Sequence, residues 1–220
     1  MKNETIIRID DESGQVMVER VVYGVKSFKQ IDPDTLVKCI NQSLLRNTVS
    51  SGLLPKGCLS FASCDDGSRE VYILHPENRA NITFFDAEYK DFPLPRLAFG
   101  FRIGKEGRIY SCRLGVAADD EVMKPGTKMY HYPLSNVRGT HLCLGNNVLP
   151  KCTSLHTLSS LPYLIMAMPN NLDGFSAGYN KLRLEMRDLL ELLKDKDGRF
   201  YYSDVLIPSG KTLGDFIVSR

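Results

Sequence analysis

Cysteine and histidine are the side chains of this chain that could act as nucleophiles or hold a metal. Six cysteines and four histidines occur among its 220 residues. The cysteines are Cys39, Cys58, Cys64, Cys112, Cys143 and Cys152. None of them forms a Cys-x-x-Cys pair, and no apolar secretion signal follows the first residues. The pattern therefore favours reduced thiols in a cytoplasmic protein over a disulfide framework.

One irregular stretch, residues 130–156, concentrates these side chains and holds three of the histidines and two of the cysteines. Free cysteine is usually a small buried hydrophobe, so a reactive one must be identified from its neighbours. Cys39 is expected to be buried on a helix, and the next three cysteines on strands. Cys143 differs because it lies in a Gly- and Asn-rich loop, where chemistry tends to sit. Cys143 is therefore the candidate nucleophile.

A zinc site is the alternative use of the same stretch. His141-x-Cys143 and Cys152-x-x-x-His156 supply four borderline-soft ligands, and His131 lies nearby in the sequence. Structural zinc sites usually use tighter pairs, with about 2–4 residues between cysteines. Because the spacing here does not match, we expect no bound metal and no cofactor.

The N-terminal third predicts a hairpin followed by a helix. Residues 5–9 and 16–22 flank a polar turn, which is typical of two paired strands. Asp32-Pro33 is a strong helix start, with Asp as the cap and Pro in the first turn. The helix should end before Gly52, and its apolar side chains share one face. They are Leu36, Val37, Ile40 and Leu44.

The rest of the chain predicts an antiparallel meander followed by helices. Polar turns join residues 58–63 to 70–74 and residues 97–103 to 108–114, giving four strands. An apolar segment, 158–168, is typical of a short helix. A final helix is predicted over about 177–194 from a stripe of apolar residues at helical spacing. The stripe is Leu182, Met186, Leu189, Leu190 and Leu193.

Composition limits the class of protein. Lys plus Arg is 28 and Asp plus Glu is 26, so the net charge is only +2 and no nucleic-acid partner is indicated. No apolar run approaches the ~20 residues that a membrane helix needs, so no membrane partner is expected either. We therefore predict a cytoplasmic α+β protein, with residues 1–31 as a β-hairpin extension and residues 32–220 as one domain.

The stretch 130–147 resembles the active-site region of ubiquitin-conjugating enzymes, in which a His-Pro-Asn tripeptide precedes an Ile-Cys-Leu. It is most similar to a bacterial branch that includes protein B of the PRTRC gene system. The matching residues are Pro133, Asn136, Val137, Gly139, Cys143, Gly145 and Asn146. Residues 92–99 resemble the Pro-rich entry into the third strand, and Pro169-Asn170 resembles the end of the helix that follows the cysteine. Three differences stand out: His131 and Pro133 are separated from Asn136, the stretch 99–136 is longer, and the chain lacks Trp.

The resemblance implies a fold with an N-terminal helix, a four-stranded antiparallel meander, an active-site loop and C-terminal helices. It also implies a reaction in which Cys143 carries a ubiquitin-like protein as a thioester. A ThiF-like activating enzyme would supply this modifier, and a lysine of a target protein would accept it. Asn136 would donate a hydrogen bond to the oxyanion, although Asn can also simply hold a turn. Asp173, just after Pro169-Asn170, would orient the incoming lysine.

Two hypotheses without catalysis remain beside the enzyme. In one, a conjugating-like fold holds a ubiquitin-like partner or scaffolds a complex. In the other, the chain is a zinc-stabilised structural protein. The presence of both Cys143 and Asn136 favours the enzyme.

Overall fold

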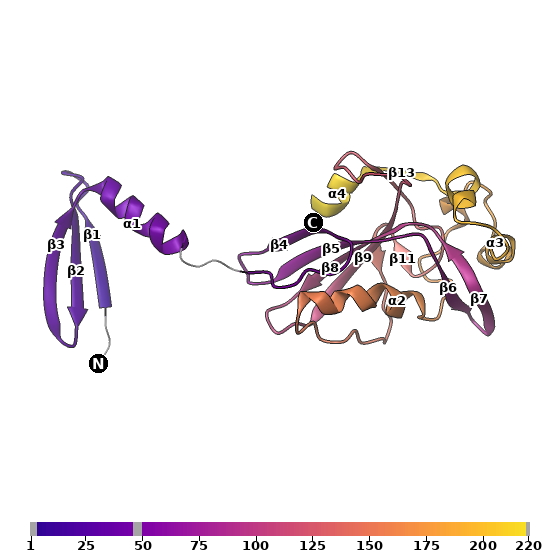
Figure 1. Ribbon diagram of the computed structural model, residues 1–220, viewed down its shortest axis with the longest axis horizontal. Helices are drawn as coiled ribbons and strands as arrows, with labels where there is room; N and C mark the ends of the chain where they lie inside the picture. Colours follow the sequence, from indigo (N-terminus) through magenta and orange to yellow (C-terminus); the bar gives the residue numbers. More distant parts are fainter. Residues whose placement is uncertain (1–3, 46–49, 219–220) are drawn as a thin grey trace. The chain divides into compact units, whose positions relative to one another are not determined.

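The computed structural model describes residues 4–45 and 50–218, and the chain divides into two compact units, residues 1–50 and 51–220. The protein is α+β, with mostly antiparallel sheets and few helices (Figure 1). The described part of the chain begins with strands and not with a helix. The predicted helix follows the predicted hairpin and one further strand, so it does not open the fold. The predicted domain boundary precedes this helix, whereas the compact units divide after it.

The first unit contains a three-stranded meander and one helix. Its strands are β1 (Glu4–Ile9), β2 (Val16–Val22) and β3 (Val25–Ile31), paired in that order. The predicted hairpin is confirmed, and β3 was not predicted. Tyr23 and Gly24 have φ angles of +50° and +84°, the left-handed conformation of a two-residue hairpin turn.

The helix of this unit is α1 (Pro33–Leu45), and it begins where the sequence predicts. The Asp32 carboxylate accepts a hydrogen bond from the Thr35 backbone N–H at 2.8 Å, as an N-cap should. Val37 and Ile40, on the predicted apolar face, are exposed. Leu44 was also predicted on this face, but its side chain lies outside the part of the chain that the structure describes.

The second unit is built on an eight-stranded sheet curled into a half-barrel. It contains the predicted meander, which begins with β4 at one edge of the sheet and is formed by β4 (Cys58–Ser63), β5 (Arg69–His75), β8 (Leu97–Ile103) and β9 (Ile109–Ala117). Gly67 and Gly107 adopt φ angles of +74° and +79° in its two polar turns. Four short strands extend this sheet. They are β10 (Lys128–Tyr130), β11 (Val137–Arg138), β12 (His141–Leu142) and β13 (Pro208–Thr212).

A separate hairpin interrupts the meander between β5 and β8. It consists of β6 (Asn78–Phe84) and β7 (Ala87–Leu94), which form a two-stranded sheet of their own. The sequence indicated only a Pro-rich entry segment here. Pro93 lies opposite Arg79 within this two-stranded ribbon, where a residue without an N–H is tolerated.

The helix predicted over residues 158–168 is close to what the structure shows, and the helix predicted over residues 177–194 is shorter. A 3-10 helix, η1 (Leu155–Ser160), leads into α2 (Leu161–Met166), with Pro162 in the first turn. α3 spans Met186–Leu193 instead of 177–194. The buried Asn180 side chain accepts from the Leu184 N–H at 2.9 Å and donates to the Leu184 carbonyl at 3.0 Å. These bonds hold the preceding segment out of the helix, and Leu182 is exposed.

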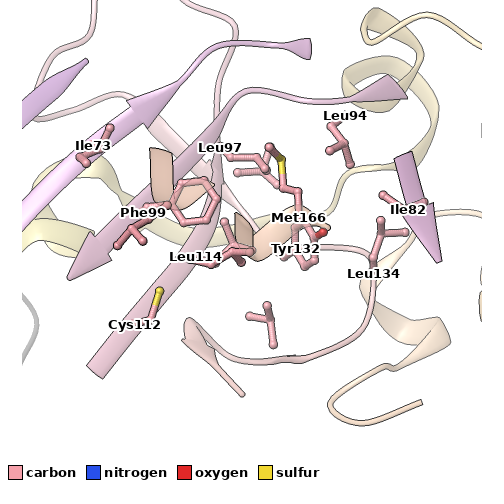
Figure 2. Close-up of a cluster of buried hydrophobic side chains, with 14 of the residues drawn as sticks. Ile73, Ile82, Leu94, Leu97, Phe99, Cys112, Leu114, Tyr132, Leu134 and Met166 are labelled. Atoms are coloured by element: carbon pink, nitrogen blue, oxygen red, sulfur yellow. The ribbon is translucent and has the colours of Figure 1, made fainter. Parts of the chain in front are cut away.

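The core of the second unit lies between one face of the sheet and helices α2 and α3. Figure 2 shows part of it, where Phe99 of β8 and Leu114 of β9 meet Met166 of α2. A smaller cluster on the other face is covered by α4 (Leu213–Val218) through Leu213 and Phe216. Two short helical turns, η2 (Ala177–Tyr179) and η3 (Tyr201–Val205), complete the unit. No helix among the described residues is both long and apolar enough to cross a membrane.

Candidate active site

Cys143 is the first residue beyond a small hairpin at the edge of the curled sheet. Strands β11 and β12 pair through Val137–Leu142 and Arg138–His141, and Gly139 between them has a φ of +63°. The Cys143 backbone N–H donates to the Asn136 carbonyl at 2.7 Å, which continues the ladder by one bond. The Cys143 side chain itself is exposed. The hairpin therefore fixes the backbone of Cys143 and leaves its thiol accessible.

A second loop, residues 169–174, lies directly against this hairpin. The Asn136 backbone N–H donates to the Asp173 carbonyl at 2.6 Å. Gly174 has a φ of +67°, and a Cβ placed on it would lie 2.8 Å from the Val137 carbonyl oxygen. Only glycine therefore allows the two loops to approach this closely. This contact brings Asp173 to the cysteine from 30 residues along the chain.

The structure brings the three predicted residues together. The Cys143 side chain lies close enough to the Asp173 carboxylate to lower the pKa of that carboxyl. The Arg138 guanidinium contacts the same carboxylate, with Nη2 2.8 Å from Oδ1. These two contacts, Cys143 first and Arg138 second, hold the pKa of Asp173 below its usual value. Asp173 is therefore a carboxylate at neutral pH, and it lies beside the exposed thiol with a cation at its far side.

Asn136 occupies an unusual backbone conformation. Its φ is +65°, in the left-handed region that Asn tolerates better than most residues. Its side-chain amide donates to the Pro169 carbonyl at 3.1 Å, which ties the two loops together. A primary amide has two N–H donors, and the other one has no hydrogen-bond partner within residues 4–45 and 50–218. Asn136 therefore holds the loop and still has one donor to offer.

A buried polar pair supports both loops from beneath. The Ser135 hydroxyl donates to the Asn170 side-chain oxygen at 2.9 Å, and both residues are buried. The Asn170 amide donates in turn to the Thr83 carbonyl of β6 at 3.2 Å. The Phe85 N–H donates to the Asn170 carbonyl at 3.1 Å. The inserted β6–β7 hairpin therefore anchors the loop that carries Asp173.

Sequence reasoning missed Arg138 and this buried pair. The sequence did contain a signal for Arg138, since it lies within residues 130–147 and carries the charge opposite to that of Asp173. It contained little signal for Ser135 and Asn170, because nothing in their local sequence shows that polar side chains so far apart meet in the interior.

The other cysteines correct part of the expectation. Cys39, expected to be buried, is exposed, and Cys58 and Cys64 are half-buried. Cys112 and Cys152 are buried, and burial raises the pKa of the Cys112 thiol. Exposure alone therefore does not single out Cys143, and its contact with Asp173 is what distinguishes it.

The zinc alternative finds no support in the described part of the chain. Across residues 4–45 and 50–218, no group of three or more His, Cys, Asp or Glu is placed to hold a metal ion. His131 stacks instead on Tyr179, with ring centroids 4.7 Å apart. Burial, and then the nearby Lys211, lower the pKa of His131. The histidines and cysteines of residues 130–156 therefore do not form a common site.

No family model, no curated protein and no solved structure gives a significant match to this chain.

Proposed function

We propose that this chain is a ubiquitin-conjugating-like enzyme, in which Cys143 takes a ubiquitin-like protein as a thioester and passes it to an amine. The donor would be a ThiF-like activating enzyme and the acceptor a lysine of a target protein. The proposal includes the finer description of the fold, a conjugating-like domain carrying an active-site loop. It rests on the resemblance of residues 130–147 and on the geometry around the thiol.

One observation carries the proposal. The sequence suggests separate roles in one reaction for Asn136, Cys143 and Asp173, and in the folded chain backbone hydrogen bonds join Cys143 to Asn136 and Asn136 to Asp173. Cys143 is exposed at the end of a strand, where a protein-sized acyl donor has access.

The residues suggest how each step would proceed. In loading, the Cys143 thiolate attacks the donor's thioester carbonyl; a new C–S bond forms, the donor's C–S bond breaks, and the donor leaves as a thiolate. In transfer, a neutral lysine amine attacks the Cys143 thioester; a C–N bond forms, the C–S bond breaks, and the amine proton goes to water. The unused N–H of Asn136 would stabilise the oxyanion between these events.

Asp173 would act in transfer by its charge. A carboxylate beside the thioester attracts the ammonium form of lysine and so holds the acceptor near the carbonyl carbon. Because its pKa lies below the usual value, Asp173 is a weak base and orients the acceptor better than it removes a proton.

A binding module is the second candidate, and one observation favours it. The Asn136 amide already bonds to the Pro169 carbonyl, a contact that serves the loop whether or not any reaction occurs. In that case the same surface would hold a ubiquitin-like partner or scaffold a complex without acyl transfer.

Transfer from an artificially loaded cysteine separates the two candidates. A fluorescent Gly-Gly peptide carried as a mercaptoethanesulfonate thioester can load Cys143 by thiol exchange without an activating enzyme. The loaded protein is purified and mixed with lysine, and its discharge is compared with that of the free peptide thioester. An enzyme accelerates the reaction with lysine over the free thioester. Equal rates would leave the binding module as the better description.

A further inference from the structure

The Asp173 carboxylate is already occupied in the unloaded protein. Arg138 Nη2 lies 2.8 Å from Oδ1, and the Cys143 side chain and the Gly174 backbone N–H are close enough to lower the pKa of the carboxyl. These three groups, from β11, the end of β12 and the Asp173 loop, are what the carboxylate meets from the elements packed against it. An acceptor ammonium that approaches Cys143 therefore finds the charge of Asp173 neutralised.

We propose that Arg138 is a specificity-determining residue, which occupies the position of the acceptor ammonium on Asp173 and must be displaced before a lysine can react. This inference rests on the proposed function of Cys143. Arg138 suits the role because its side chain is 77% exposed, so it can move into solvent without opening the core. A competing cation, or salt, weakens its ion pair with Asp173.

The strength of the pair sets the size of the effect. Exposed ion pairs are weak, and the loss of one changes an equilibrium constant by at most about fivefold. An acceptor can thus displace Arg138 from Asp173 during catalysis, and the effect of Arg138 on acceptor binding is still large enough to measure. A carboxylate next to the acceptor lysine could pair with Arg138 and so release Asp173. Such a lysine would gain the factor of up to about fivefold in binding. The site would therefore favour a lysine that has a carboxylate beside it over an isolated lysine.

The test uses protein loaded with the Gly-Gly peptide thioester and Nα-acetyl-lysinamide as the acceptor, which has one amine and one positive charge. In Arg138→Gln we expect the KM for this acceptor to fall about two- to fivefold with kcat nearly unchanged. Its KM should also rise more steeply with salt than in wild type, because Asp173 is then an unpaired charge. Arg138→Lys should behave like wild type.

Two controls distinguish competition from a structural role. Hydroxylamine, an uncharged nucleophile, should discharge Arg138→Gln and wild type equally. Arg79→Gln removes another arginine that pairs with an aspartate at 2.8 Å, in the β6–β7 hairpin, and should leave the KM unchanged. A KM for Arg138→Gln that is equal to or above wild type, or equal losses with both nucleophiles, overturns the inference while leaving the proposed function intact. A loaded wild type that reacts with lysinamide no faster than the free thioester overturns the proposed function, and this inference with it.

Discussion

Cys112 lies within a strand of the curled sheet and Cys143 lies just beyond the neighbouring strand, in opposite surroundings. Cys112 precedes Arg113 within β9, and Cys143 follows β12, whose His141 pairs with Arg113. Cys112 is 3% exposed among the apolar side chains of Figure 2. Cys143 is exposed and lies beside the Asp173 carboxylate. The comparison teaches that a cysteine inside a strand can be buried in the core, whereas a cysteine just beyond the end of a strand can be accessible to solvent.

The largest expected contrast is in acyl loading. Cys143→Ser should lower acylation of residue 143 by the Gly-Gly peptide donor by at least about 10³-fold, with an ester as the product, because a neutral hydroxyl is a far weaker nucleophile than a thiolate. Cys112→Ala should load normally and lose about 0.5–3 kcal/mol of unfolding free energy, as core truncations do. Gel fluorescence and urea denaturation measure the two quantities. Normal loading of Cys143→Ser would remove the distinction between the two thiols.

The next contrast separates the two steps of the reaction at Asn136. Asn136→Gly tolerates the left-handed backbone and removes the amide, so it should load like wild type and discharge to lysine ~10²–10³-fold more slowly. Asn136→Ala should add backbone strain of about 1–2 kcal/mol to the same defect. Single-turnover discharge and circular dichroism report on each. A Gly variant that discharges at the wild-type rate would assign Asn136 to holding the loop alone.

Alkylation tests the comparison without any acyl donor. Cys143 and the exposed Cys39 should react with iodoacetamide at least about 100-fold faster than Cys112, which requires opening of the core before it can react. Peptide mapping after limited labelling gives the order. Early labelling of Cys112 or Cys152 would show that the burial described here does not protect them.

The smallest expected effect belongs to Asp173. A lowered pKa means that Asp173 is ionised in the folded protein from neutral pH down to below its usual value, and any stability it adds is lost only when the pH falls through that lowered pKa. Wild-type discharge between about pH 6 and 9 should therefore follow deprotonation of the lysine amine, without a break due to Asp173.

Asp173→Asn should slow discharge about fivefold near neutral pH, where lysine is an ammonium that a carboxylate can hold. The deficit should shrink as the pH approaches the pKa of lysine. A deficit that grows with pH would contradict a purely orienting role.

Local sequence signals were enough for the elements with clear turns and caps. Asp32-Pro33 marked the start of α1, and the polar turns around Gly67 and Gly107 marked the meander. The turn before β3 was missed because Tyr23-Gly24 lacks the Asn or Asp that usually signals such a hairpin. The predicted start of α3 was wrong because the helical stripe was extended through Leu182, while the buried Asn180 holds that segment by side-chain bonds.

The residues of the candidate site likewise fall into those that local sequence predicts and those that depend on contacts between distant segments. Cys143 and Asn136 could be selected because both lie in one short stretch and meet within one hairpin. The position of Asp173 depends on Gly174 packing against Val137 and on the buried Ser135–Asn170 contact, and neither could be read from local sequence. Arg138 was overlooked because its meaning depends on that distant aspartate.

The most direct test of the account is to map the acyl group on the loaded wild-type protein. The protein is incubated with the labelled Gly-Gly peptide thioester, digested at low pH without reductant, and analysed by tandem mass spectrometry. The account predicts a hydroxylamine-sensitive acyl group on the peptide that contains Cys143, at higher occupancy than on the peptide that contains the exposed Cys39. Labelling of Cys39 or Cys58 in preference to Cys143, or an acyl group that resists hydroxylamine, would contradict the assignment of Cys143 as the thioester-forming residue.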